Sequence, residues 1–206
     1  MKTLYLFMLL ITISSCVSKK YTKMKQLPDE IRSATEIKYL VKNDQKLLLY
    51  SKQMNFTKNG RIKNSVTTDT SGKVIQTTQK KLWFIVETYP DKENYYCKTR
   101  WKPNSRERIS CYTRKQIKQN EAIYTYNPNG TINTITDHYP PFYTKYHQYA
   151  NQSLSKIIIK DKNNILIDKF LIHCIKKDER GSCLQEIRTS TKTNQTEEYL
   201  FIPKYH

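Results

Sequence analysis

Short apolar and aromatic runs, separated by polar turn signals, follow one another from residue 46 to the C-terminus. Two of them, 47–50 and 82–89, are rich in leucine, aromatic and β-branched residues, which is typical of strands. No apolar run after the first fifteen residues approaches the length of a membrane-spanning helix. The pattern predicts a mainly β domain: an antiparallel meander in the form of a curved sheet, a sandwich or a small barrel.

The turn signals share a loose motif, in which a small polar pair is followed within two residues by a branched apolar residue. It occurs as NGRI at 59–62, SGKV at 71–74, NGTI at 129–132 and NNIL at 163–166. The motif is similar to the hairpin punctuation of YD-type and MORN-type repeats. Its irregular period favours instead a plain meander of antiparallel hairpins.

One segment favours a helix. Pro28 suits the first turn of a helix, and the acidic residues Asp29 and Glu30 are favourable near a helix N-terminus. We therefore expect a short helix that begins at Pro28 and extends to about Tyr39.

The first sixteen residues, MKTLYLFMLLITISSC, form a separate unit. Lys2 precedes an apolar run at 3–13, which is too short to span a bilayer but has the length of a signal-peptide core. The run ends in ISSC at 13–16, which resembles the lipobox of bacterial lipoproteins. This resemblance implies cleavage before Cys16, diacylation of its sulfur and acylation of the new amino terminus. An ordinary signal peptide with a cysteine near its end by chance is the alternative.

A lipid on Cys16 predicts a membrane-anchored protein of the cell envelope, because two or three acyl chains hold a protein stably on a bilayer. Val17 stands where an aspartate would favour the inner membrane of enteric bacteria, so the resemblance favours the outer membrane, on its periplasmic face or at the cell surface. The chain then divides into a signal peptide (1–15), a polar, basic, lipidated tether (16–28) and a single β-rich domain (29–206).

Composition narrows the classes of function. Lysine and arginine number 36 against 18 acidic residues, for a formal charge of +18. This excess favours an anionic envelope component or an acidic protein as partner, and the location disfavours nucleic acid. A lysine-rich composition inherited from an AT-rich genome is the alternative explanation. The sequence holds four glycines, shows no catalytic motif and lacks metal-ligand spacing, so it predicts no enzyme site, no cofactor and no metal.

Besides Cys16, the chain has four cysteines, an even number that in an exported protein predicts two disulfides. Three pairings are possible, and the expected hairpins favour local ones. A hairpin centred on residue 104 places the first two cysteines directly opposite each other, at bridging distance. A turn at 178–181 brings the other two together. The expected disulfides are Cys97–Cys111 and Cys174–Cys183.

The hairpin centred on residue 104 also supplies the candidate binding surface. In its expected register Arg100 faces Arg108, and like charges opposed across strands are destabilising unless an acidic surface meets them. The alternative is that these long side chains splay into solvent. The candidate binding residues are Lys98, Arg100, Lys102, Arg106, Arg108 and Arg114. The tyrosine-rich segment 124–149 is the next candidate, because tyrosine is enriched at interfaces, although the composition favours the alternative of tyrosines half-buried on a small β domain.

These features together predict a binding protein attached to a membrane by its lipid. One concrete form is an immunity-type lipoprotein that neutralises a secreted antibacterial toxin. A surface adhesin and an envelope-assembly lipoprotein fit the same features. A hydrolase acting on an anionic envelope polymer is a further alternative.

Overall fold

The computed structural model describes residues 26–27, 30–43, 45–102, 106–113 and 115–206. These residues form fourteen antiparallel strands. They are β1 (Ile31–Lys42), β2 (Gln45–Phe56), β3 (Ile62–Thr68), β4 (Val74–Lys80), β5 (Ile85–Thr88), β6 (Tyr96–Lys102), β7 (Arg106–Tyr112), β8 (Lys118–Tyr126), β9 (Ile132–Asp137), β10 (Thr144–Ala150), β11 (Ser153–Lys160), β12 (Leu166–Lys177), β13 (Cys183–Ser190) and β14 (Thr196–Tyr205).

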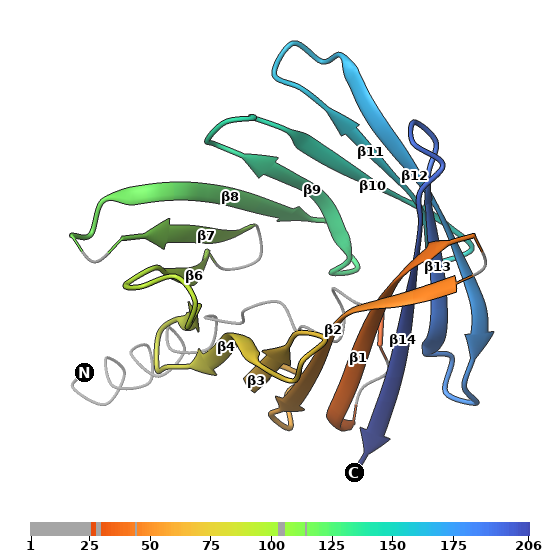
Figure 1. Cartoon of the computed structure of the whole chain (residues 1–206), viewed down its shortest axis with the longest axis horizontal. Coiled ribbons are helices and arrows are strands. Elements are labelled where there is room, and N and C mark those ends of the chain that lie inside the picture. Colours follow the sequence, from red (N-terminus) through yellow and green to blue (C-terminus); the bar gives the residue numbers. More distant parts are fainter. Residues whose placement is uncertain (1–25, 28–29, 44, 103–105, 114) are drawn as a thin grey trace, which may run out of the picture.

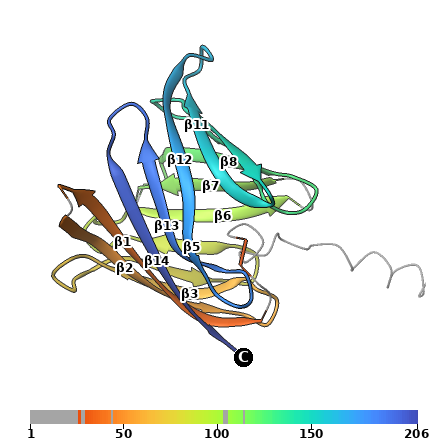
Figure 2. The ribbon, with the colours of Figure 1, turned by 90° about the vertical axis from the view of Figure 1, so that its right-hand side faces the viewer.

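Each strand pairs with its neighbours in the sequence, and β1 pairs with β14 to close the ring (Figure 1). The meander predicted from the sequence is therefore confirmed, and among its expected forms the structure is a closed barrel. Figure 2 shows β1, β14 and β13 side by side along one wall.

The predicted N-terminal helix is wrong. Residues 31–42 form β1, and Pro28 and Asp29 lie outside the described residues. Glu36 lies between Lys52 of β2 and Phe201 of β14, so half of the pairing of β1 comes from the far end of the chain. This long-range pairing, which local signals cannot show, outweighs the weak helix-start signal.

One type of turn joins many of the hairpins. The N–H of its first residue bonds to the carbonyl four residues on, and the N–H of its fourth residue bonds back to the first carbonyl. The fourth residue has a positive φ, as in a type I turn followed by a G1 bulge. It is Gly60, Gly72, Gln116, Gly130, Asn164 or Gly181. Four of these six turns contain the polar-pair motif of the sequence.

An aspartate at the first position of such a turn fixes it further. Asp161 Oδ1 accepts the N–H groups of Asn163 and Ile165, each at 2.9 Å. Asp178 accepts those of Arg180 and Ser182 in the same way. Short side chains that bond to nearby backbone favour turns over regular strands, so these residues set where the strands end.

Buried apolar side chains pack together near one end of the barrel. Their shared feature is an exposure of at most 7 %, and they are Ile31, Ala34, Met54, Phe56 and Ile62. Leu27, Phe201 and Tyr205 pack against this cluster, so the described N-terminal segment and the C-terminal strand meet at this end.

The outer face of the barrel carries paired threonines across neighbouring strands. The hydroxyl oxygens of Thr77 and Thr88 lie 2.6 Å apart, and those of Thr125 and Thr134 lie 2.7 Å apart.

Within the described ranges, no helix has the length and apolar character needed to cross a bilayer.

Two disulfides staple the meander. Cys97–Cys111 joins β6 to β7, and Cys174–Cys183 joins β12 to β13, which are the local pairings expected from the sequence. The β6–β7 register is also the expected one, with Arg100 opposite Arg108. Closing a loop of this size stabilises the fold by about 3 kcal/mol in the chain-entropy view.

A second correction concerns the apolar run at 82–89. The strand β5 begins only at Ile85, and residues 81–84 form a tight turn in which Lys81 N–H bonds to Phe84 C=O at 2.8 Å. Leu82 and Trp83 are 80 % and 71 % exposed at the tip of this turn. Residues that composition assigns to a core strand thus lie in solvent.

Candidate ligand-binding cavity

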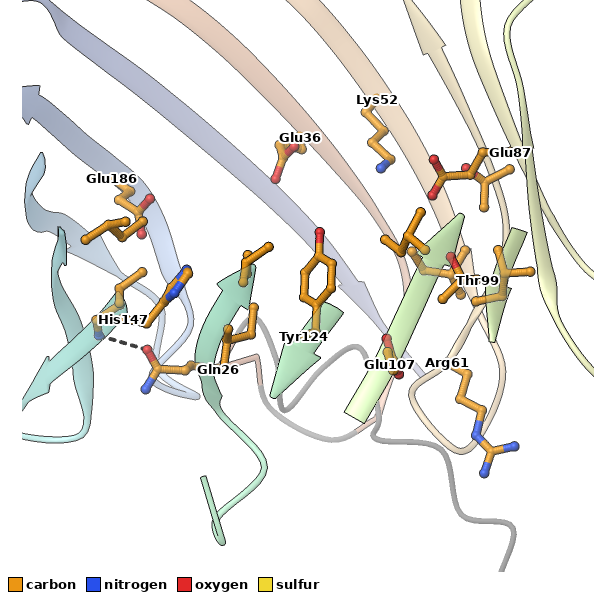
Figure 3. A pocket seen from close by; sticks show the side chains of 18 of the residues that line it. Gln26, Glu36, Lys52, Arg61, Glu87, Thr99, Glu107, Tyr124, His147 and Glu186 are labelled. Atoms are coloured by element: carbon orange, nitrogen blue, oxygen red, sulfur yellow. Dashed lines mark hydrogen bonds between the residues drawn. The ribbon is translucent and has the colours of Figure 1, made fainter. Parts of the chain in front are cut away.

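The barrel encloses a cavity of about 440 Å³ next to the apolar cluster (Figure 3). Its volume is within the range of small-molecule pockets, roughly 300–1,000 Å³. Side chains of most of the strands line it, because every second residue of each strand points inward.

One arc of the cavity wall is polar. It comes from β13, β1, β2, β4 and β5, which follow one another around the barrel with β14 and β3 between them. Figure 3 shows Glu186, Glu36, Lys52 and Glu87 in a row along this arc. The polar arc consists of Glu36, Tyr50, Lys52, Thr78, Lys80, Glu87, Glu186 and Arg188.

The facing arc is mainly apolar. It comes from the consecutive strands β7 to β11. Its apolar and aromatic members are Ile109, Tyr124, Ile132, Ile135, Tyr149, Leu154 and Ile157, and the same strands also contribute Glu107 and His147. The cavity therefore has two chemically different sides.

The charges in the cavity wall balance when Glu107 is ionised. The acidic residues Glu36, Glu87, Glu107 and Glu186 number four, and so do the cations Lys52, Arg61, Lys80 and Arg188. The large positive charge of the chain is thus not concentrated in the cavity, which favours no single sign of ligand charge.

Arg188 is held by an ion pair and by a ring. Its Nε donates to Glu186 Oε1 at 2.6 Å, and its guanidinium carbon lies 4.4 Å from the centroid of the Tyr199 ring. Burial alone would lower the pKa of Arg188, but the charge and hydrogen bond of Glu186, together with the charges of Tyr199 and Glu36, outweigh burial and raise that pKa. Arg188 therefore stays charged at the cavity wall.

Further polar contacts extend this network of ion pairs and hydrogen bonds. Tyr50 Oη donates to Glu36 Oε1 at 3.0 Å. Lys38 bonds to Glu197 at 2.8 Å, and its ammonium lies 5.1 Å from the centroid of the Tyr199 ring. These contacts order the polar arc before any ligand enters.

Glu107 is the carboxylate whose protonation is most strongly altered. It lines the cavity on the apolar side, is 9 % exposed and accepts a hydrogen bond from Tyr126. Burial raises the pKa of Glu107 to about 7, although the hydrogen bond from Tyr126 opposes this. Its charge therefore changes near neutral pH.

The segment just before β1 lies at the rim of the cavity. Gln26 Oε1 accepts the N–H of Leu154 at 2.9 Å, and its amide nitrogen donates to the carbonyl of Gln152. Leu27, the next residue, packs on the apolar cluster that contains Ile31 and Ile62. Residues 26 and 27 thus connect the β10–β11 turn with the wall formed by β1 and β3.

The predicted basic surface forms in part. Arg100 and Arg108 are exposed on the outer face, and Lys98 lies 5.5 Å from the centroid of the Phe84 ring. Glu121 of β8 lies 3.8 Å from Arg108 and 2.8 Å from Lys118, so an acid from the next strand partly neutralises this face. The side chains of Lys102 and Arg106, and residues Arg114 and Cys16, lie outside what the structure describes.

The cavity was missed from the sequence, although one signal pointed to it. The tyrosine-rich segment 124–149 supplies Tyr124 and Tyr149 to the cavity wall, and Tyr126 to the hydrogen bond with Glu107. Alternation of isoleucine and tyrosine with threonine along β8 and β9 is the signal that could have marked an inner face.

Comparisons with known proteins add little. No protein-family model matches the sequence, and no curated protein is similar to it. A LolA-superfamily protein from Nitrosomonas europaea is similar in structure, with a TM-score of 0.43 and 10 % identity over 90 % of this chain and 92 % of that one.

Two further solved structures are less similar. A DUF1329-family protein from Desulfovibrio piger has a TM-score of 0.34 and 6 % identity over 86 % and 87 % of the two chains. A putative outer membrane lipoprotein-sorting protein domain from Vibrio parahaemolyticus has a TM-score of 0.32 and 7 % identity over 84 % of each chain. These values are too low to transfer a function.

Among the described residues, no group of three or more histidine, cysteine or acidic side chains converges as metal ligands.

Proposed function

We propose that this chain is a binding protein of the cell envelope that holds one amphipathic molecule inside its barrel. The observation that carries the proposal is the two-sided lining of the cavity of about 440 Å³. The apolar part of the ligand lies against the isoleucines of β7 to β11. Its polar part faces Glu36, Lys52 and Arg188.

An acyl or similar hydrocarbon group supplies the affinity. Burial of one methylene is worth about 0.8 kcal/mol, so ten would contribute roughly 8 kcal/mol before the costs of association. Because the costs of association subtract from that gross energy, it sets a lower limit of about 1 μM on the dissociation constant. The apolar arc, with Ile109, Ile135 and Ile157, offers a surface of the matching kind.

The polar part of the ligand is uncharged or zwitterionic. With Glu107 ionised, the carboxylates and cations of the wall are equal in number, so a ligand of one sign would gain no net attraction. The hydroxyl of Thr78 is buried without a hydrogen-bond partner among the described residues. An unsatisfied buried hydroxyl costs about 1–3 kcal/mol, so a polar ligand group that reached it would be stabilised.

The location in the envelope rests on the lipobox-like segment at 13–16 and on the two disulfides, which are typical of exported proteins. Acylation of Cys16 is part of the same proposal. Metabolic labelling with palmitate tests it: labelling of a Cys16→Ser variant at the level of the wild type would contradict the anchor.

A pair of neighbouring substitutions tests the cavity. Ile157 points inward and Ile158 outward on β11. Ile157→Trp should fill the cavity and abolish the fluorescence gain of the neutral amphipathic probe N-phenyl-1-naphthylamine, whereas Ile158→Trp should leave probe binding unchanged. Equal probe binding by both folded variants, checked by circular dichroism, would show that the cavity is not the binding site.

A further inference from the structure

The turn between β4 and β5 presents apolar side chains to solvent. Leu82 and Trp83 are 80 % and 71 % exposed at its tip, and the bond from Lys81 N–H to Phe84 C=O holds the turn closed. An ordered turn therefore displays a leucine and a tryptophan with little of their surface in contact with the barrel. Tryptophan is enriched at the interface between membrane and water, where its ring has both apolar and polar contacts.

Cations surround this tip without acids between them. The neighbouring β2–β3 turn belongs to the same end of the barrel, since β3 pairs with β4 through Asn64 and Gln79. The stretches 57–64 and 79–84 contain no aspartate or glutamate. We call the following exposed set the basic tip: Lys58, Lys63, Lys81, Leu82 and Trp83.

The chain enters the barrel at the same end. Leu27 packs on the apolar cluster that includes Ile62, the first residue of β3 after the β2–β3 turn. Nine residues lie between Cys16 and Gln26, so these two residues can be at most about 35 Å apart when that stretch is fully extended. An anchor on Cys16 would thus hold this end of the barrel near the membrane.

We infer that the basic tip docks on an anionic lipid bilayer, with Leu82 and Trp83 inserted at the headgroup level and the cations against lipid phosphates. Lys80 and Ile85, which flank the turn, also line the cavity. Docking therefore brings the cavity wall next to the bilayer. The inference does not depend on which ligand the cavity holds, nor on whether Cys16 is acylated.

The test uses the folded full chain with a protease site inserted in the segment 17–25, so that the barrel is released from any anchor after folding. Sedimentation with vesicles of phosphatidylcholine and phosphatidylglycerol should show binding of the released barrel. Leu82→Ser with Trp83→Ser should weaken it on the order of 100-fold, because two large apolar side chains lose their burial. Ile117→Ser is the matched control, since Ile117 is 55 % exposed in the β7–β8 turn at the other end of the barrel.

Charge changes give a second measurement. Lys58→Gln and Lys81→Gln should each weaken binding to the anionic vesicles about five-fold and have no effect on pure phosphatidylcholine. In the tethered chain with Trp101→Phe, brominated lipids should quench Trp83. Full binding by the double serine variant, no binding by the released wild-type barrel, or unquenched Trp83 would each overturn the inference.

Discussion

The hairpin β6–β7 has two faces of opposite character. The inward side chains, Cys97, Thr99, Glu107, Ile109 and Cys111, are bridged by a disulfide or line the cavity. Between them, Arg100 and Arg108 point outward and are cationic and exposed. Charge along the sequence indicates only the outer face, whereas the chemistry that can select a ligand lies on the inner face.

The inner and outer faces of the barrel also differ in how their charged side chains are paired and exposed. Inside, Arg188 is paired at 2.6 Å with Glu186, and both side chains are 21 % exposed. Outside, Arg108 is 46 % exposed and lies 3.8 Å from Glu121. A charge withdrawn from water depends on its partner far more than a charge that water screens. Changes to the inner face should therefore alter stability more than changes to the outer one.

The largest expected effect is the loss of Arg188. Arg188→Met leaves the Glu186 carboxylate without its cation and removes the contact with the Tyr199 ring. We expect a loss of about 3 kcal/mol in the free energy of unfolding, measured by urea denaturation with the disulfides intact. Arg108→Met, its counterpart on the outer face, should cost less than about 1 kcal/mol.

A double variant isolates the cause of that loss. Arg188→Met with Glu186→Gln removes the stranded carboxylate as well, so it should be more stable than Arg188→Met alone. If the single inner and outer variants lost equal stability, the contrast between the two faces would be wrong.

The next effect depends on pH and has opposite signs on the two faces. The pKa of Glu107 is raised by burial from 4.5 to about 7, so the stability that protonation supplies is complete below about pH 4.5 and is lost as the pH rises to about 7. The variant Glu107→Gln cannot ionise, so it does not lose this stability as the pH rises. At pH 8 we expect it to be more stable than the wild type by about 3 kcal/mol, and at pH 4 to be equal to it.

Glu121 provides the outer counterpart. Burial raises the pKa of Glu121, but hydrogen bonds from Lys118 and Ser110 lower it, and the net result is a pKa below its ordinary value. Its contribution to stability is therefore present above its ordinary pKa and is lost as the pH falls through the lowered one. Glu121→Gln should be less stable than the wild type at pH 7, and the difference should vanish in acid. Urea titrations from about pH 2 to about pH 8 measure both profiles.

The sequence carried enough information for the local structure of the barrel. Four turn motifs, the β6–β7 register and both disulfides depend on residues close together along the chain, and all were predicted. The β1–β14 pairing could not be predicted, because it joins Ile31 to Tyr205 across the whole chain. The helix expected at residues 28–39 was wrong for the same reason.

The cavity required knowledge of the ring closure. Whether an inward side chain meets a packed core or an open space depends on the curvature of all the strands together. Ile109 and Ile157 are four strands apart, yet both line the cavity. Leu82 and Trp83 show the converse, since their apolar character suggested a buried strand whereas they lie exposed in a turn.

The smallest expected effect on stability concerns the outer face. Arg100→Glu places an acid directly opposite Arg108 in place of a like charge. A favourable cross-strand pair contributes about 0.2–1 kcal/mol, so the melting temperature should hold or rise slightly.

The same variant tests whether this face binds an acidic protein. Immunity-type capture of an acidic protein through this face predicts that Arg100→Glu binds poly-L-glutamate more weakly, and that added salt slows association with the wild type. Arg100→Gln should weaken binding less, because it removes a charge without reversing it. If the outer face is a binding site, the variant loses affinity while its stability is kept. Unchanged affinity, measured by calorimetry at low salt, would show instead that the outer face of β6–β7 is solvated surface and that recognition belongs to the inner face.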